Sequence, residues 1–272
     1  MNLPQPKRLR RTPAVPPDRA AEVVAHRGAS HDRPEHTLAA YEQAIADGAD
    51  ALECDVRLTA DGRLVCVHDR RVDRTSDGRG AVSAMTLAEL DRLDFGSWRG
   101  EGAEPARVLA FDELLALATS APRPVALAVE TKHPTRWAGR VEQELVRQLR
   151  LFGLDRRVPG EPPRVRLMSF SRLALRRMAV LAPDLPRVLL TERGWPLPGR
   201  AAALPRGVRI AGPGIDLVRS RPELVPRLRA AGHRVHVWTV DEPEDVELCL
   251  RLGVEALITN RPRQVLEQIG DR

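Results

Sequence analysis

The stretch EVVAHRGASHDRPEHTLAAYEQAIADGADALECDV, residues 22–56, predicts a strand, a helix and a second strand in that order. The short apolar runs at 22–27 and 51–56 are typical of buried strands, whereas TLAAYEQAIADG at 37–48 has helical spacing and ends at a glycine. Two strands joined by a helix form the βαβ unit of a parallel sheet. This unit therefore indicates an α/β fold.

The same alternation continues towards the C-terminus. Further strands are expected at 125–131, 165–170, 187–192, 208–213, 234–240 and 255–260, and further helices at 111–119, 137–153, 171–182, 222–232, 244–253 and 261–270. Eight strands that alternate with helices over about 240 residues predict a TIM (β/α)8 barrel. An open, doubly wound sheet is the alternative, because little helix is expected directly after the strand at 208–213.

Two segments fall outside this alternation. Residues 69–110 are rich in Arg, Gly and Asp and are expected to form a small insertion after the second strand of a barrel that spans 21–272. Residues 1–20 form a basic, Pro-rich leader that is expected to be flexible and that carries +4 of the net charge of +6. A nucleic-acid-binding domain concentrates basic charge on a folded surface, so nucleic acid is not expected as a partner.

Cysteine usage and hydropathy favour an intracellular protein. Cys54, Cys66 and Cys249 are odd in number and have no C-x-x-C spacing, so neither a disulfide framework nor a thiolate zinc site is indicated. No apolar run approaches the roughly 18 residues of a membrane span. The leader also lacks the apolar segment of a secretory signal. We expect a cytoplasmic protein without a transmembrane segment, and the sequence leaves its oligomeric state open.

Three acidic residues occupy the ends of two predicted strands. Glu53 and Asp55 share one face of ALECDV, and Glu130 shares a face of AVETK with Lys132, because residues two apart in a strand point the same way. Carboxylates buried together need a cation, and three oxygen ligands suit Mg²⁺ or Ca²⁺. The alternative is an ion pair of Glu130 with Lys132 and a solvated position for the other two.

Two histidines are predicted to lie near these carboxylates. His26 ends the first strand in AHRG, and His68 ends the apolar run LVCVH that follows the carboxylate strand. In barrel enzymes, catalytic side chains lie at such strand ends. Two histidines can divide proton removal and proton donation between them. Arg27 and Lys132 are candidates for contacts to phosphate oxygens.

Several short motifs follow one another along the chain in an order that resembles a family signature. HRG, PEHT, ECD and HD lie between residues 26 and 69, and DRTSDGRGAV, MTLAELDRLDFGSW, AVETK, VRLMSF, VHVWTV and GVEALITNRP follow. Over about residues 22–265 the chain resembles the glycerophosphodiester phosphodiesterase family, whose signature runs HRG, PENT, E-x-D and HD. The resemblance implies a TIM barrel with a small insertion after the second strand. It also implies hydrolysis of glycerophosphodiesters to sn-glycerol 3-phosphate and an alcohol, with one bound divalent cation.

The resemblance assigns roles to individual residues. It implies metal ligands at Glu53, Asp55 and Glu130, acid/base histidines at His26 and His68, phosphate contacts at Arg27 and Lys132, a substrate-lining indole at Trp238, and an acidic residue that orders the first loop at Glu35. We favour His68 as the acid. The head group, the choice between Mg²⁺ and Ca²⁺, and the attacking oxygen, which is water or the neighbouring glycerol hydroxyl, stay open.

For four further residues near these positions, the sequence allows more than one location. His36 stands where PENT has Asn and is expected at the surface beside a helix N-terminus, with an influence on the first loop and the head-group preference as the alternative. His236 is expected to be a strand histidine with satisfied hydrogen bonds, with a place in the site as the alternative, because it shares a face with Trp238. Either Ser169 or Phe170 is expected to line the site. Two other functions are considered. One is lysophospholipase D-like hydrolysis of larger lipids, and the other is a non-catalytic barrel that binds phosphorylated glycerol compounds.

Overall fold

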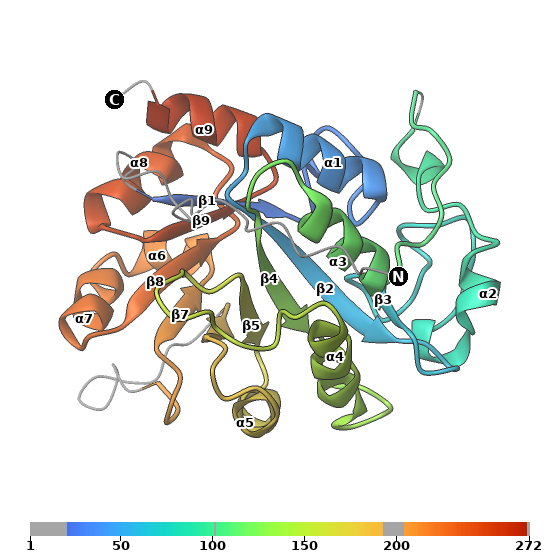
Figure 1. The fold of residues 1–272 in the computed structure, drawn as a ribbon. Coiled ribbons are helices and arrows are strands. Elements are labelled where there is room, and N and C mark those ends of the chain that lie inside the picture. Colours follow the sequence, from blue (N-terminus) through green and yellow to red (C-terminus); the bar gives the residue numbers. More distant parts are fainter. Residues whose placement is uncertain (1–20, 101, 193–203, 271–272) are drawn as a thin grey trace, which may run out of the picture.

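The structure, a computed structural model, describes residues 21–100, 102–192 and 204–270. The leader predicted at 1–20 lies outside the described residues. Strands alternate with helices along most of this part of the chain, as Figure 1 shows. No helix within it has the length and apolar character that crossing a membrane requires.

Eight parallel strands form a closed barrel. They are β1 (Glu22–His26), β2 (Ala51–Leu58), β4 (Ala126–Thr131), β5 (Val165–Ser169), β6 (Arg187–Thr191), β7 (Ile210–Pro213), β8 (Arg234–Trp238) and β9 (Ala256–Thr259). Their order around the barrel is β1-β9-β8-β7-β6-β5-β4-β2, and the parallel pairing of β1 with β2 closes the ring. The TIM barrel is therefore confirmed, and the open sheet is excluded.

Helices surround the strands (Figure 1). They are α1 (Leu38–Asp47), α3 (Phe111–Ser120), α4 (Arg140–Leu151), α5 (Arg172–Leu181), α6 (Ile215–Ser220), α7 (Leu224–Ala230), α8 (Pro243–Leu252) and α9 (Pro262–Gly270). The sequence did not indicate α6, because its six residues are too few to show a helical period. Its place directly after β7 supplies the helix that the prediction lacked there.

Alternation along the strands creates two apolar regions. Outward-facing residues such as Leu52, Val129 and Leu167 are fully buried against the helices. Inward-facing residues such as Val24 and Met168 fill the centre of the barrel together with several alanines. Each fully buried aliphatic side chain contributes about 1.5–3 kcal/mol relative to an exposed one. The centre is thus packed, and the polar residues lie above and below it.

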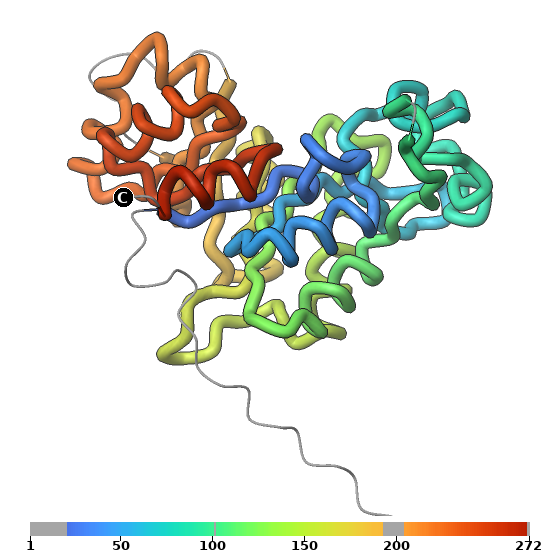
Figure 2. Tube along the Cα trace, turned by 90° about the horizontal axis from the view of Figure 1, so that it is seen from above, coloured from blue at the N-terminus to red at the C-terminus, as the bar shows by residue number. Residues whose placement is uncertain are grey.

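The insertion after the second strand is present as expected. The chain leaves the barrel at β3 (Leu64–Cys66), before the expected start at residue 69, and β3 pairs antiparallel with β2. The segment contains α2 (Leu87–Leu90) and the short turns η1 (Val82–Ala84) and η2 (Ser97–Arg99). It is held by an apolar cluster of its own, formed by Val65, Val67, Val72, Val82, Leu90, Phe95 and Val108. Figure 2 shows this segment projecting from one side of the barrel.

Candidate active site

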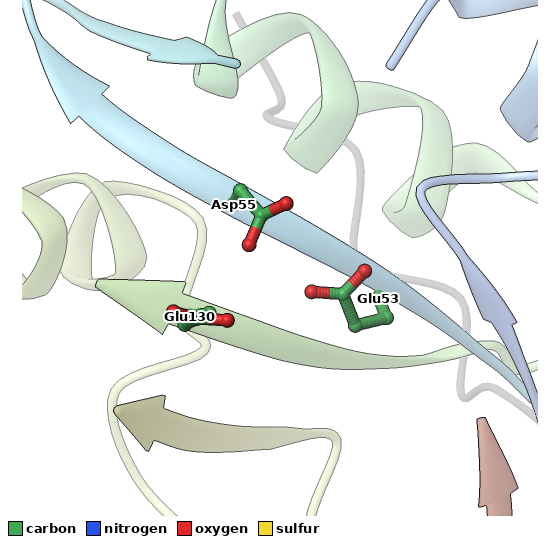
Figure 3. Close-up of side chains that lie close together, drawn as sticks. All are labelled: Glu53, Asp55 and Glu130. Carbon is green, nitrogen blue, oxygen red and sulfur yellow. The ribbon is translucent and has the colours of Figure 1, made fainter. Parts of the chain in front are cut away.

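Three carboxylates converge inside the barrel at the C-terminal ends of two neighbouring strands. Glu53 and Asp55 lie on β2, and Glu130 lies on β4 opposite Asp55 in the strand register (Figure 3). All three side chains are buried, and each offers an oxygen that lies within 4.8 Å of the other two. The structure therefore brings together the three residues that the sequence singled out as possible metal ligands.

Two cations already contact this cluster. The Nζ atom of Lys132 lies 2.9 Å from Glu130 Oε1 and 3.0 Å from Asp55 Oδ1, and Arg27 Nε lies 3.1 Å from Asp55 Oδ2. The ion pair considered as the alternative to a metal site thus exists. Because three carboxylates face only two cations here, this ion pair does not exclude a metal site.

The pKa values of the carboxylates are shifted in the directions expected where buried negative charges lie close together. Burial, reinforced by the charge of Asp55, raises the pKa of Glu53 well above its usual range and that of Glu130 to about 8. Burial also opposes ionisation of Asp55, but Lys132, His36 and Arg27 outweigh it and hold the pKa of Asp55 well below its usual range. Among the described residues, the Glu53 side chain accepts one hydrogen bond, from the backbone N–H of Arg27 to Oε2 at 3.0 Å. The residues therefore fit a hard divalent cation, which oxygen ligands prefer.

A sharp turn after β1 places Arg27. Its φ of 58° lies in the left-handed region, and the next residue, Gly28, has φ 84°. A Cβ on Gly28 would lie 2.6 Å from the backbone of Ala40 in α1, so only glycine fits this close approach. The turn directs the Arg27 guanidinium to Asp55 and to Glu35, whose Oε1 lies 3.0 Å from Nη1.

The expectation for His36 was wrong, because the side chain is buried rather than at the surface. Its Nε2 lies 3.0 Å from Asp55 Oδ2, and its Nδ1 lies 2.8 Å from the hydroxyl of Tyr41. A carboxylate can only accept, so Nε2 is the donor. His36 has φ 60°, and this turn directly before the N-cap of α1 sends the ring inward. A local helix-start pattern does not reveal such a turn.

His26 is held by a neutral amide. Its Nδ1 lies 2.7 Å from Asn260 Oδ1, and Asn260 Nδ2 donates to Asp241 Oδ2 at 2.6 Å. This arrangement places the proton on Nδ1 and leaves the lone pair on Nε2. Burial, together with the charge of Arg27, lowers the pKa of His26 to about 3. The sequence interpretation missed Asn260 and Asp241, although Asn260 ends the strand expected at 255–260 and Asp241 directly follows the strand expected at 234–240.

His68 is held by a carboxylate instead. Its Nδ1 lies 2.7 Å from Asp69 Oδ1, and Arg74 donates to Asp69 and also to both carboxylate oxygens of Glu35. Burial lowers the pKa of His68 to about 4, although the charge of Asp55 opposes this. Asp69 and Arg74 were not predicted, although the HD pair in the sequence contains the first of them. Glu35 joins this network to Arg27, which agrees with a role in ordering the first loop.

The far side of the mouth carries aromatic residues. Trp238 ends β8, donates from Nε1 to Gly212 O at 2.8 Å, and meets Phe170 edge-on at 5.5 Å between ring centroids. Phe170 is 44% exposed, whereas Ser169 is buried and donates to Thr131 O. Of the two candidates, Phe170 therefore lies at the mouth.

His236 does not belong to this mouth. It is fully buried, and neither ring nitrogen has a hydrogen-bond partner among the described residues. The expectation of a satisfied strand histidine was therefore wrong. The strand register places it level with Glu22 at the opposite end of the barrel interior.

Comparison with known proteins identifies close relatives of the chain. Residues 26–264 match the model of the glycerophosphoryl diester phosphodiesterase family. A probable glycerophosphodiester phosphodiesterase 1 from Mycobacterium tuberculosis is 47% identical over 254 residues, which cover 92% of each chain. A glycerophosphodiester phosphodiesterase from Bacillus subtilis is 36% identical over 90% of this chain and 85% of its own length.

Solved structures agree with these matches. A putative glycerophosphoryl diester phosphodiesterase from Silicibacter pomeroyi superposes with a TM-score of 0.80 at 25% identity, covering 93% of this chain and 94% of its own. A phosphodiesterase from Oleispira antarctica, solved in complex with the product sn-glycerol-3-phosphate, also has a TM-score of 0.80 at 25% identity. The match covers 92% of this chain and 96% of that one.

Proposed function

This chain belongs to the glycerophosphoryl diester phosphodiesterase family and is a phosphodiesterase, and on that premise we propose a metal-dependent reaction with two catalytic histidines. The substrates are glycerophosphodiesters, and the products are sn-glycerol 3-phosphate and an alcohol. The observation that carries the proposal is the convergence of three buried carboxylates at the mouth of the barrel, beside His26 and His68. The product complex of the Oleispira antarctica relative supports the identity of the product.

Glu53, Asp55 and Glu130 would hold one Mg²⁺ or Ca²⁺. When bound, such an ion supplies positive charge that stabilises the charge developing on the phosphate oxygens. Lys132 and Arg27 lie against the same carboxylates and add fixed positive charge beside them. His36 holds Asp55 in place from the other side.

The two histidines divide the proton transfers according to their partners. His26 has a neutral amide partner and a free lone pair on Nε2, so it removes the proton from the attacking oxygen. His68 has the Asp69 carboxylate behind it, which favours the protonated ring, so it donates the proton to the departing alkoxide. A bound phosphate anion raises the pKa of both rings, because a nearby negative charge favours the imidazolium.

We also propose that the protein works in a reducing cytoplasm, and its thiols support this proposal. Cys54, Cys66 and Cys249 are all free and buried. Cys54 lies on β2, the strand that carries Glu53 and Asp55, and Cys66 lies on the adjacent β3. Comparison of the enzyme's activity in the cytoplasmic, membrane and extracellular fractions of cells tests this proposal.

A substrate panel tests the proposed activity. Glycerophosphocholine, glycerophosphoethanolamine, glycerophosphoglycerol, glycerophosphoinositol and a lysolipid are each incubated with the protein, with and without added Mg²⁺ or Ca²⁺. We expect release of sn-glycerol 3-phosphate from the water-soluble diesters when a cation is present. Hydrolysis confined to the lysolipid would favour the lysophospholipase D-like alternative. Binding of the diesters without any product would favour a non-catalytic barrel.

A further inference from the structure

A pocket beside the carboxylate cluster, at the mouth of the barrel, is lined by basic side chains. It lies between the end of β2, the insertion and the loop from β4 to α4, and its charged residues are Arg57, Arg70, Lys132 and Arg136. We call these four residues the basic pocket. Of the described residues that line it, none is acidic. Four positive charges around one hollow repel each other and favour an anion between them.

The basic pocket borders the carboxylate cluster. Lys132 is common to both, since its Nζ contacts Asp55 and Glu130. Arg57 donates from Nε and Nη2 to the carbonyl of His68 at 3.0 and 2.7 Å, which ties the pocket to that histidine. A group bound in the pocket would therefore lie next to the atoms that take part in the reaction.

Three of the four cations, Arg57, Arg70 and Arg136, have no ion pair among the described residues, and Arg57 donates instead to the His68 carbonyl. Of these, Arg70 and Arg136 are exposed. The guanidinium of Arg136 stacks on the ring of Trp137 at 4.9 Å, which positions the group without neutralising it. By contrast, other exposed arginines of the insertion, such as Arg74 and Arg107, have carboxylate partners. Other arginines of the insertion, Arg79 and Arg92, also have no ion pair among the described residues, but only at the pocket do several such cations line one hollow within this part of the chain.

From this arrangement we propose that the basic pocket binds a second anionic group of the substrate, carried by its alcohol half. The inference rests on the proposed function. The glycerol half has only one charged group, the phosphate that is attacked, so any further anion belongs to the leaving alcohol. Trp238, the residue that the resemblance places against the substrate, ends β8, which lies four strands from β4 in either direction around the barrel. The basic pocket and Trp238 therefore lie on opposite sides of the mouth, so the two halves of a substrate can face different walls. The preferred substrates are therefore glycerophosphodiesters whose alcohol bears a phosphate.

A pair of substrates that differ by one phosphate tests the proposal. Glycerophosphoinositol and the same compound with a phosphate on its inositol ring are compared by kcat/KM. We expect the wild-type enzyme to prefer the phosphorylated compound. Arg70→Gln and Arg136→Gln should each reduce kcat/KM for that compound about tenfold, the usual scale for one charge-assisted contact, and leave glycerophosphoinositol unchanged. Added salt should weaken the preference, since the contacts are partly exposed.

A matched variant controls for the loss of positive charge. Arg227→Gln removes an exposed arginine from α7, which packs against β8 and contributes nothing to the pocket. This variant should keep the wild-type preference. Equal rates for the two compounds, or an equal loss on both in the pocket variants, would overturn the inference while leaving the proposed function intact. If neither inositol compound is hydrolysed but other diesters of the substrate panel are, only the inference fails. If no diester of the panel is hydrolysed, the proposed function fails as well.

Discussion

The two ends of the barrel interior both bury charged side chains, but they balance the charges differently. Near the N-terminal ends of the strands, Glu22 and Arg166 form one ion pair at 2.7 Å. At the C-terminal ends, Glu53, Asp55 and Glu130 outnumber the cations that contact them. The Glu22–Arg166 pair is matched in charge, whereas the surplus of buried carboxylates must be neutralised by protons or by an additional cation. The comparison teaches that charge imbalance, rather than buried charge, distinguishes the functional end.

Neutralising one carboxylate of the surplus should have the largest effect on turnover. Asp55→Asn removes the charge that Lys132, Arg27 and His36 surround, and we expect activity to fall about 10³-fold or more. Steady-state hydrolysis of glycerophosphoglycerol measures the effect. Asp112→Asn, which alters a partly exposed carboxylate paired with Arg63, is the control. Activity of the Asp55 variant within tenfold of the wild type would remove this residue from the site.

Removing either histidine at the functional end should have a smaller effect. His26→Ala and His68→Ala should each lower turnover about 10²–10⁴-fold, the usual contribution of general acid–base catalysis. Circular dichroism should show an intact fold in both variants. His236→Ala at the other end provides the comparison, because that ring contacts no described polar partner and should not affect the chemistry. Full activity in the His26→Ala or the His68→Ala variant would exclude that histidine from the mechanism.

The partner of His26 should affect the pH profile more than the maximal rate. Asn260→Ala removes one hydrogen bond to Nδ1, and we expect about a tenfold loss of kcat/KM. Asn260→Asp places a carboxylate there instead, which favours the imidazolium and raises the pKa of His26. The acidic limb of the kcat/KM profile should then move to higher pH, because the base is protonated more easily. An unchanged profile would argue against His26 as the base.

Breaking the Glu22–Arg166 ion pair at the N-terminal end should lower stability without changing the rate of the reaction. Arg166→Met leaves Glu22 buried without its partner and should lower the free energy of unfolding by about 3–5 kcal/mol. The double variant Glu22→Gln with Arg166→Met should recover most of this loss. Urea unfolding measures the stability, and the activity per folded molecule should stay near the wild-type value. A large loss of activity in the folded double variant would contradict the separation of the two ends.

Low pH should weaken the network around Glu35, and its effect on the free energy of unfolding should be smaller than that of Arg166→Met. Burial alone would raise the pKa of Glu35, but hydrogen bonds from Arg74 and the charge of Arg27 outweigh it and lower the pKa to about 2. The folded pKa lies below the unfolded one, so this carboxylate stabilises the protein above about pH 4.5 and loses its effect as the pH falls towards 2. Arg74→Met should lower the free energy of unfolding at pH 7 by about 2 kcal/mol.

The measurement for this last prediction is unfolding at several pH values. The difference between wild type and Arg74→Met should shrink as the pH falls from 4.5 to 2. An equal difference at all pH values would show that Arg74 stabilises the protein through contacts other than Glu35.

Local patterns in the sequence predicted the barrel, because each strand and most helices show their own period. They also placed Glu53 and Asp55 on one face of a strand, since that depends only on alternation. Contacts that depend on closure of the barrel were not accessible in this way. His26 and Asn260 lie 234 residues apart and meet because β1 pairs with β9.

The missed places of His36 and His236 have different physical causes. The inward direction of His36 follows from a positive φ, which the sequence of a helix start does not specify. His236 has an alternating pattern that correctly predicts an inward face, but the lack of a partner depends on which side chains the other strands supply at that level. The strand pattern therefore predicts direction, and only the assembled barrel determines the partners.

The central claim is that the surplus of carboxylates at the functional end holds a divalent cation that the reaction needs. Its most direct test is hydrolysis of glycerophosphoglycerol by protein treated with EDTA, followed as Mg²⁺ or Ca²⁺ is titrated back. The account predicts no turnover in the chelator and a saturable recovery when one ion is bound per chain. Turnover that is unaffected by EDTA would contradict it.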